Sequence, residues 1–542
     1  MGYKPETLQN IQAIQLNAYR KLAESIGEES EDVFNHVVSD AMLDISNTDA
    51  VSFYVKRDDV LEFIIMKTKS MKFSAGGIKE NITLPPFKLF DEDGNPKHSS
   101  IVGYSATTGK TVNIKDVYKH DDGVIDFSKA KDFDKQTGYR TTSVLAMPIN
   151  DYQGNCQGLI QMINAQDFET GETIVFSKQL VSDLQNFTKQ VGSYMNQRKL
   201  LKDMENLFEA LIQLIAKAID KKSHYTGKHC ERVPILAEMI SSELCKQKEG
   251  KFKNFNLNKD EKNELRIAAW LHDTGKIATP PHVNDKATKL ERIIDGIELI
   301  EHRIEILKKN VEIDFLKQKI NFIESGDNKG IDEAESLMDK QIGLYEEYMK
   351  LLHEVNIGGE NLEKKKIKKI NRAHKEQLMV NGESLNLLDD YEKNVLSIKR
   401  GTLDDNERNK INEHVSITYE LLNEIPFPNN LKNVPTIAAY HHEKLDGSGY
   451  PFRKKAKDLS VQSRVLGFSD IFEALTAPDR PYKKANTLRE SLDIMYEMCN
   501  KGKIDKGIFK VFLNRKLYTK YAKKHIHKSQ IDDIDIQKYS FS

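Results

Sequence analysis

Residues 441–451 read His-His-Glu-Lys-Leu-Asp-Gly-Ser-Gly-Tyr-Pro, and this run decides how the second half of the chain is interpreted. Two adjacent imidazoles are followed by acidic side chains and by a glycine-rich loop that ends in proline. Core packing explains such a run poorly, because buried polar groups are costly unless they are paired or bound to a metal. We therefore expect the run to supply metal ligands.

A second motif ends the apolar segment 267–271, where His272-Asp273-Thr-Gly275-Lys276 follows directly. A His-Asp pair at a helix end lets an imidazole and a carboxylate point at one place. The carboxylate has two oxygens and can bridge two cations. The glycine permits a close approach of the backbone, and the lysine can reach a phosphate.

Three further candidates have side chains of the same kinds: His229 in segment 225–232, His414 in segment 411–415, and Asp470 after an apolar run. A lone buried histidine is more often a core residue than a ligand. Spaced histidines that accompany a His-His pair and a His-Asp pair in one helical domain indicate a metal centre instead. Nitrogen and carboxylate ligands without thiolate suit iron, manganese or zinc.

These motifs resemble the HD-GYP family, the phosphodiesterase branch of the HD metal-dependent phosphohydrolases. His272-Asp273 is similar to the HD signature and residues 449–451 to the GYP signature, and the match covers about residues 216–290 and 400–500. The resemblance implies seven metal ligands: His229, His272, Asp273, His414, His441, His442 and Asp470.

The same resemblance implies roles around the metals. Asp273 would be shared between two metals, and Lys276 would contact the scissile phosphate. Segment 480–483 is similar to the RPY segment of the family, so Arg480 and Lys483 would hold substrate phosphates. Trinuclear members carry a glutamate where this chain has Tyr225, and tyrosine, with a pKa of about 10, is a poor ligand at neutral pH. We therefore expect two divalent ions, iron or manganese, rather than three.

The implied reaction is hydrolysis of a cyclic dinucleotide by a metal-bridging hydroxide, with cyclic di-GMP opened to linear pGpG and a further cut giving GMP. Two alternatives stay open. The domain could be a metal-bound sensor without turnover, although His272, Asp273, His441 and His442 are all present. The substrate could also be another cyclic dinucleotide, such as cyclic GMP-AMP, because residues that contact the bases cannot be identified from sequence.

The N-terminal part changes character. Segments 51–55 and 61–65 predict one β-hairpin, and segments 144–149 and 158–164 predict another, which indicates an α+β module on an antiparallel sheet. Segments such as 103–110 and 158–164 resemble a GAF domain over about residues 30–185. Ala165 follows Asn164 where cyclic-nucleotide-binding members carry Asn-Lys. An unknown small ligand and a ligand-free dimerisation module both remain open.

The two halves are joined by a segment with helical periodicity. Apolar residues recur with the spacing of a coiled coil at Leu180, Leu184, Phe187, Val191 and Tyr194, and again at Met204, Phe208, Leu211 and Ile215. We expect one long helix, paired with its copy in a homodimer. The alternative is an amphipathic helix packed on its own domain. A change in the N-terminal module would be transmitted along this helix.

The fold class is therefore multidomain. We expect an N-terminal helix over 1–30, a GAF-like α+β domain over 31–185 and a connecting helix over 186–215. An all-α HD-type metal phosphohydrolase domain then covers 216–542, with a helical insertion at about 286–395 whose apolar face includes residues 293, 294, 297, 299, 300 and 304.

Composition excludes several classes. The 542 residues include 81 basic and 82 acidic side chains, so the net charge of −1 indicates neither a nucleic-acid polymer nor a membrane surface as partner. We find no run of about 18 apolar residues that could span a bilayer. The four cysteines form no CxxC pair, which favours reduced thiols in a cytoplasmic protein.

Overall fold

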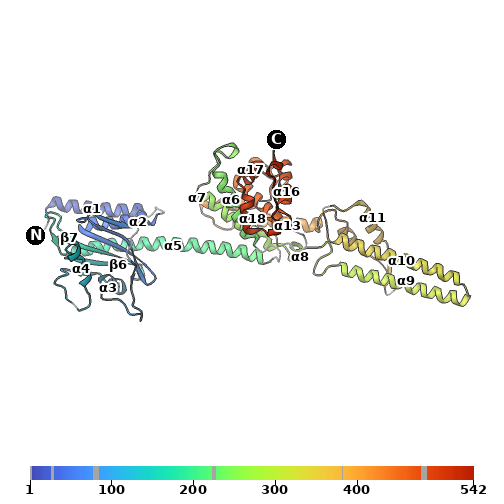
Figure 1. Cartoon of the computed structure of the whole chain (residues 1–542), viewed down its shortest axis with the longest axis horizontal. Coiled ribbons are helices and arrows are strands. Elements are labelled where there is room, and N and C mark those ends of the chain that lie inside the picture. Colours follow the sequence, from blue (N-terminus) through green and yellow to red (C-terminus); the bar gives the residue numbers. More distant parts are fainter. Residues whose placement is uncertain are drawn as a thin grey trace. The chain divides into compact units, whose positions relative to one another are not determined.

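The computed structural model describes residues 3–25, 30–76, 85–121, 123–222, 228–359, 361–380, 382–477 and 485–541. Contacts divide the chain into two compact units, Met1–Leu207 and Phe208–Ser542. Helix α5 (Lys178–Lys222) contributes residues to both units (Figure 1). No helix in the described ranges is long and apolar enough to cross a membrane.

The N-terminal unit is built on an antiparallel sheet with the strand order β3-β2-β1-β7-β6-β5. Strand β4 also pairs with β2, and β8 pairs with β7. The strands are β1 (Thr48–Arg57), β2 (Val60–Thr68), β3 (Phe73–Gly76), β4 (Phe87–Lys88), β5 (Val112–Ile114), β6 (Val144–Asn150), β7 (Cys156–Gln166) and β8 (Thr173–Ile174). Both predicted hairpins are confirmed, as β1–β2 and β6–β7.

Side chains alternate between the two faces of this sheet, as the pleat of a strand requires. Val51 and Phe53 of β1 pack in one core with helices α1 and α2 and the start of α5. Tyr54, which follows Phe53 and points to the other face, packs in a second core with α3. The predicted α+β module is thus confirmed, and its helices are α1 (Pro5–Glu24), α2 (Glu31–Ser46), α3 (Ile101–Thr108) and α4 (Ser128–Thr137).

The first part of α5 belongs to the N-terminal core. Leu184, Phe187 and Val191 are fully buried against the sheet and against α1 and α2. The prediction that these residues form a seam with a second chain was therefore wrong, because their own domain already covers them. One apolar stripe at helical spacing looks the same in the sequence whether its partner is the same chain or another.

The rest of α5 carries a different stripe. Leu200, Met204, Leu207, Leu211 and Leu214 recur at spacings of 4, 3, 4 and 3 and are all exposed. Phe208, which the sequence placed in the seam, instead contacts Phe427 of the C-terminal unit, with ring centroids 6.5 Å apart.

The C-terminal unit is almost entirely helical, as predicted. Its α-helices that surround the predicted motifs are α6 (His229–Cys245), α7 (Lys259–Leu271), α8 (Pro281–Asn284), α13 (Asp405–Asn423), α14 (Val434–Ala439), α15 (Val461–Thr476), α16 (Leu488–Asn500), α17 (Lys506–Asn514) and α18 (Leu517–His525). Short 3₁₀ segments connect them, among them η3 (Thr274–Ala278).

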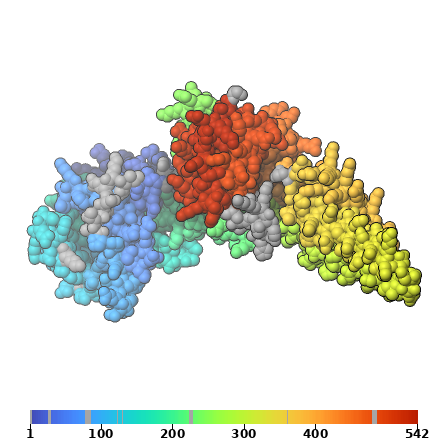
Figure 2. All heavy atoms as spheres, turned by 45° about the vertical axis from the view of Figure 1, so that its right-hand side comes forward, coloured from blue at the N-terminus to red at the C-terminus, as the bar shows by residue number. Residues whose placement is uncertain are grey.

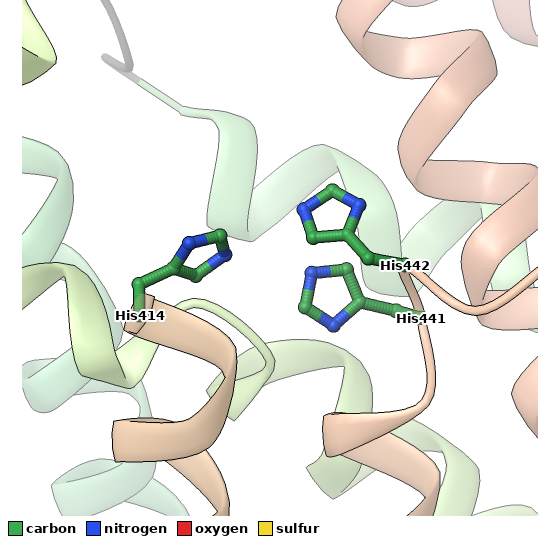
Figure 3. Close-up of side chains that lie close together, drawn as sticks. All are labelled: His414, His441 and His442. Carbon is green, nitrogen blue, oxygen red and sulfur yellow. The ribbon is translucent and has the colours of Figure 1, made fainter. Parts of the chain in front are cut away.

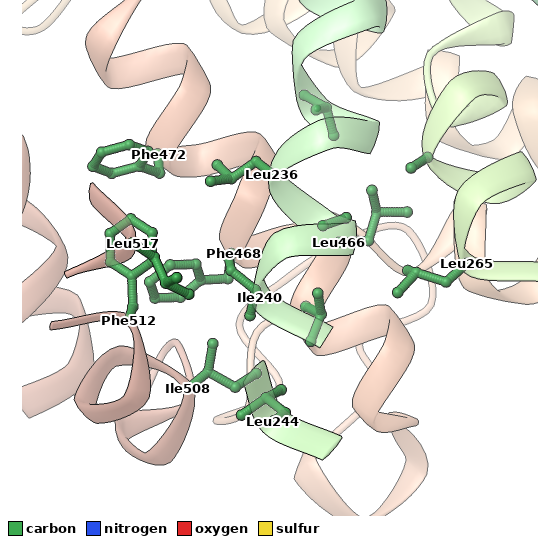
Figure 4. Packing of buried hydrophobic residues seen from close by; sticks show 14 of the residues in the cluster. Leu236, Ile240, Leu244, Leu265, Leu466, Phe468, Phe472, Ile508, Phe512 and Leu517 are labelled. Atoms are coloured by element: carbon green, nitrogen blue, oxygen red, sulfur yellow. The ribbon is translucent and has the colours of Figure 1, made fainter. Parts of the chain in front are cut away.

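The main core of this unit lies between α6, α7, α15 and the C-terminal helices (Figure 4). Leu236 and Ile240 of α6 meet Leu466 and Phe468 of α15 there, and Phe512 of α17 closes the cluster. This apolar packing fixes α6, α7 and α15, each of which ends at or carries a predicted ligand.

The insertion forms a separate core. Helices α9 (Ile297–Ser325) and α10 (Asn328–Asn356) run side by side, followed by α11 (Lys364–Ala373), the hairpin β9 (Gln377–Val380) and β10 (Glu383–Asn386), and α12 (Asp390–Leu396) (Figures 1 and 2). The predicted helical hairpin and its break after Ser325 are confirmed.

The predicted apolar face of the insertion needs a correction. Ile297, Ile300 and Ile304 are buried, whereas Ile293, Ile294 and Leu299 are 97%, 58% and 50% exposed. Residues 293 and 294 precede α9, which begins only at Ile297, so they do not share its period. Leu299 lies within α9 but outside the buried face formed by Ile297, Ile300 and Ile304.

Candidate metal centre

The His-Asp motif sits at the end of α7, which begins at a capping box between Asn258 and Glu261. His272 follows the last residue of the helix and Asp273 precedes η3, and both are buried. The Nδ1 atom of His272 lies 2.8 Å from the carbonyl oxygen of Ala269. Because a carbonyl only accepts, Nδ1 carries the hydrogen and Nε2 keeps the lone pair that a metal needs.

His414 of α13 and His441 after α14 are oriented by the same device. Their Nδ1 atoms bond to the carbonyl oxygens of Ile411 and Ala438, each three residues earlier, the second at 2.6 Å. Their Nε2 atoms are buried and make no hydrogen bond to any residue that the structure describes. A buried imidazole nitrogen with a free lone pair fits metal ligation better than packing.

His229, the first residue of α6, is oriented by a carboxylate. Its Nδ1 atom bonds to Glu473 of α15, which also accepts a hydrogen bond of 2.6 Å from Nε of Arg232. The sequence interpretation missed Glu473 and Arg232. A signal was present, because Glu473 follows Asp470 by three positions and so shares its helix face.

The two oxygens of Asp273 face different histidines. Oδ2 lies 3.2 Å from Nε2 of His229 and 3.3 Å from Nε2 of His272. Oδ1 lies 3.3 Å from Nε2 of His414. Asp470 is placed in a similar way, with Oδ1 3.4 Å from Nε2 of His229 and Oδ2 3.8 Å from Nδ1 of His442. Each carboxylate thus reaches two sides of the cluster.

All seven predicted ligands come together. They form three overlapping groups of side chains whose ligand atoms lie within 4.8 Å of one another: His229, His272 and Asp470; His272, Asp273 and His441; and His414, His441 and His442. Figure 3 shows the last group, in which the rings of His414, His441 and His442 converge from two segments of the chain.

Lys276 lies at the same place, with Nζ 2.6 Å from Oδ2 of Asp273. Its side chain is 23% exposed, whereas that of Asp273 is 3% exposed, so the ammonium group lies on the solvent side of the carboxylate. Arg480 and Lys483 lie outside the described residues, and so does Tyr225.

The electrostatics suit a divalent cation. Burial by itself would raise the pKa of Asp273, but Lys276 and His272 hold it well below its usual value. Burial and the neighbouring His272 lower the pKa of His441 to about 3. Burial lowers the pKa of His229, but Glu473, Asp273 and Asp470 raise it well above its usual value. The cluster offers nitrogen and carboxylate donors without a thiolate, a donor set that iron, manganese and zinc accept.

The loop after the two histidines is held by Glu443. Its carboxylate accepts backbone N–H groups from Phe452 and Lys454, at 2.8 and 2.9 Å. Tyr450 stacks on His442 with ring centroids 4.8 Å apart. The acidic residue of the motif therefore anchors the loop, and the loop supports a ligand.

Two distant parts of the chain meet at η3. A Cβ atom on Gly275 would lie 1.9 Å from the carbonyl oxygen of His414, so only glycine fits against α13 here. Thr418 joins the same contact, accepting from the N–H of Gly275 at 2.8 Å and donating to the carbonyl of His272 at 3.1 Å.

Residues 392–508 match the family model of the HD domain. The matched segment contains His414, the pair His441-His442 and Asp470. The C-terminal unit therefore contains a segment similar to the HD domain, and the buried His229 and His272 lie close to its histidines and to Asp470.

Curated relatives match parts of the chain. A 3′3′-cGAMP-specific phosphodiesterase 3 from Vibrio cholerae is 37% identical over 105 residues, which are 19% of this chain and 22% of that protein. The cyclic di-GMP phosphodiesterase response regulator RpfG from Xanthomonas campestris is 37% identical over 100 residues, 18% of this chain and 26% of the relative. A dual 3′,5′-cyclic-AMP and -GMP phosphodiesterase 11A from Takifugu rubripes is 34% identical over 164 residues, covering 28% and 17%.

Solved GAF domains match at low identity. One from an Acinetobacter phosphoenolpyruvate-protein phosphotransferase is 16% identical and covers 35% of this chain and 98% of its own, with a TM-score of 0.24. The nlh2 GAF domain of A. aeolicus is 14% identical, covers 35% and 99%, and has the same TM-score. Likeness at this level supports no conclusion about a ligand.

Proposed function

We propose that this protein is a metal-dependent phosphodiesterase that opens a cyclic dinucleotide, with cyclic di-GMP as substrate and linear pGpG as product. The observation that carries the proposal is the position of Asp273, whose two oxygens face different histidines of one buried cluster. The names of the matched relatives from V. cholerae and X. campestris support the substrate class.

Two divalent ions, iron or manganese, would be held by the seven histidine and aspartate ligands. His229, His272 and Asp470 would hold one, His414, His441 and His442 the other, and Asp273 would contact both. Divalent ions in such a site lower the pKa of water and polarise phosphoryl oxygens. A cyclic dinucleotide fits this chemistry because its phosphate groups are all held in phosphodiester bonds.

The protein groups contribute orientation and charge. Lys276 would bind a non-bridging phosphate oxygen, exchanging its contact with Asp273 for one with the substrate. Glu473 would keep the ring of His229 turned toward the cluster. Arg480 and Lys483 would hold further phosphate oxygens of the substrate.

A second substrate deserves the same test. Three relatives act, by their names, on 3′3′-cGAMP, so cyclic GMP-AMP is the alternative to cyclic di-GMP. A sensor that binds metal and dinucleotide without turnover is a further alternative, which the complete ligand set disfavours.

The proposal extends to the rest of the chain. The N-terminal unit, over about residues 31–185, would bind a small ligand that regulates the enzyme. The exposed stripe Leu200, Met204, Leu207, Leu211 and Leu214 would pair with that of a second copy, giving a homodimer. The connecting helix would then be shared between sensing and catalysis, with the enzyme unit over 216–542.

The deciding experiment is metal analysis of anaerobically purified protein beside turnover assays on cyclic di-GMP, cyclic GMP-AMP and cyclic di-AMP. We expect about two metal ions per chain and turnover of cyclic di-GMP to pGpG. The variant Asp273→Ala should lose both the metal and the turnover, whereas Asp260→Ala, an exposed aspartate at the start of the same helix, should retain both. Turnover that survives in Asp273→Ala would refute the site.

A further inference from the structure

The last residue of α5, Lys222, reaches into the segment that carries Lys276. Its Nζ atom lies 3.0 Å from the carbonyl oxygen of Lys276 and 2.7 Å from that of Thr279, and it also bonds to the carbonyl of Ile277. These carbonyls lie at the end of η3, where that of Lys276 also accepts the N–H of Thr279. One ammonium group therefore holds three carbonyls together.

Two residues earlier, Asp220 contacts the segment that carries His229. Its carboxylate accepts the backbone N–H of Cys230 at 3.2 Å. Cys230 directly follows His229 in the first turn of α6, where N–H groups have no helical acceptor. A carboxylate at a helix N-terminus is also favoured by the helix dipole. Asp220 is only 7% exposed, so water does not replace this bond easily.

The end of α5 is itself fixed. Ile212 belongs to the main core of the C-terminal unit, and Ala216 and Ile219 are buried as well. Buried residues at positions 212, 216 and 219 lie on one face of the helix, so the polar contacts of Asp220 and Lys222 continue a packed face. Helix α5 is continuous from Lys178 to Lys222.

We propose that Asp220 and Lys222 are positioning residues for the phosphodiesterase site, which hold the first turn of α6 and the segment η3 at a fixed separation from the end of the connecting helix. The proposal rests on the proposed function and deepens it. Asp220 acts through the ligand His229, and Lys222 acts through Lys276. A rotation or shift of α5 then moves a metal ligand and a phosphate-binding group together.

The first test compares Lys222→Met with Lys221→Met. Lys221 is the exposed neighbour, so its replacement changes the same charge without touching η3. We expect Lys222→Met to lower kcat on the cyclic dinucleotide by about 10- to 100-fold, because displacements near 1 Å have effects of this size. Metal content should stay at the wild-type level, and Lys222→Arg, which can still donate to carbonyls, should recover part of the rate.

A double variant tests whether Lys222 acts through Lys276. If it does, Lys222→Met combined with Lys276→Met turns over no more slowly than Lys276→Met alone, since the positioned group is already gone. Multiplying losses in the double variant would overturn the proposal for Lys222.

Asp220 is tested by metal affinity. Asp220→Asn keeps an acceptor for the N–H of Cys230 and should retain metal, whereas Asp220→Leu removes it and should weaken metal binding in a chelator competition. Equal affinities in the two variants would overturn the role of Asp220.

Hydrogen exchange separates this proposal from the proposed function. The N–H groups of Lys276 and Thr279 bond within η3, to the carbonyls of Asp273 and Lys276. They should exchange faster in the metal-loaded Lys222→Met protein than in Lys221→Met. A wild-type protein that is inactive on every cyclic dinucleotide would refute the proposed phosphodiesterase function. Identical exchange in the two variants would refute the positioning role of Lys222.

Discussion

Backbone carbonyls orient three of the histidines in the metal cluster. His272, His414 and His441 each bond through Nδ1 to the carbonyl oxygen three residues earlier. The bond is made within one turn of backbone and needs no side-chain partner. The orientation of these rings is therefore built into the local chain, whereas His229 depends on Glu473 from a distant helix.

The dependence of His229 on Glu473 gives a prediction. In Glu473→Gln the amide retains the shape of the side chain but not its charge, so the ion pairs of Glu473 with His229 and Arg232 are lost. Outer partners of metal-bound histidines typically contribute 10- to 100-fold in affinity, so we expect metal affinity to fall by about that factor. Competition with a chelator measures it.

Glu497→Gln is the matched control for this experiment. Glu497 forms an exposed ion pair with Lys501 at the end of α16 and is not among the candidate ligands or their partners. Such surface pairs contribute little to stability. If both variants bound metal as tightly as the wild type, Glu473 would have no part in the centre.

The sequence could predict which seven side chains gather in one cluster, but not the residues that support them. His441-His442 and His272-Asp273 stand out because adjacent polar residues in apolar surroundings are hard to explain by packing. Glu473 and Lys222 do not stand out, because each has its role only through a contact with a residue more than 50 positions away. Only the fold brings such partners together.

At the scale of elements, η3 and α13 are in close contact at Gly275. Gly275→Ala would place a methyl group 1.9 Å from the carbonyl oxygen of His414, so backbone must move. We expect a loss of stability of roughly 1–3 kcal/mol, as overpacking usually costs, and weaker metal binding because His272 and His414 shift apart. Thermal unfolding with and without metal measures both effects.

Gly343→Ala should change the stability of the protein in the opposite direction. Gly343 lies inside α10, and a Cβ atom there meets nothing within 4 Å. Alanine is favoured over glycine within a helix by about 1 kcal/mol, so this variant should be more stable. Stabilisation by Gly275→Ala as well would contradict the described packing.

The insertion contains a buried lysine that predicts a pH dependence. Lys289 is 2% exposed and donates to the carbonyls of Leu396 and Ile398, at 2.9 and 2.8 Å. Burial lowers its pKa from 10.5 to about 8. Between these two pKa values the unfolded chain binds more protons at Lys289 than the folded chain does. The contribution of Lys289 to the free energy of unfolding therefore rises with pH from about 8 to 10.5.

Urea unfolding followed by circular dichroism tests the sign. The free energy of unfolding of the wild type, taken relative to Lys289→Met, should be larger at pH 10 than at pH 8. A difference that stays constant or falls would mean that Lys289 keeps its proton in the folded protein.

Strand elements were predicted more reliably than helix partners. The hairpins follow from alternating apolar residues around turns such as Asp58-Asp59, where the signal is local. The partner of α5 is not local, since Leu184 and Met204 have the same spacing pattern but only Leu184 is buried in its own domain. Periodicity identifies the apolar face of a helix but not the segment or chain that packs against it.

At the scale of the whole molecule, the exposed part of α5 predicts the oligomeric state. Met204→Asp introduces a charge into the proposed dimer seam, where Met204 is 67% exposed in the single chain. We expect light scattering to report a dimer for the wild type and a monomer for the variant. Lys202→Asp, on the opposite side of the helix, should stay dimeric; a monomeric wild type would refute the seam.

The insertion should be dispensable for the metal centre. Its two ends are adjacent, since Thr402 donates to the carbonyl of Lys286 at 3.3 Å and the side chain of Lys286 lies 2.6 Å from Glu407. Its core is also separate from the main core. Replacing residues 288–400 by a short glycine-serine linker should leave metal content unchanged and turnover within about threefold, because shorter loops close at little entropic cost. Loss of metal in this variant would show that the insertion supports the site.

The candidate metal ligands are far apart in the sequence, so they are synthesised at different times. Asp470 follows Asp273 by 197 positions, so a ribosome working at about 5–20 residues per second finishes one roughly 10 to 40 seconds after the other. During that interval His229, His272 and Asp273 have been synthesised but Asp470 has not. A metal ion held by all of these side chains could therefore be captured in full only near the end of synthesis, and a nascent chain stalled before α15 should bind metal poorly.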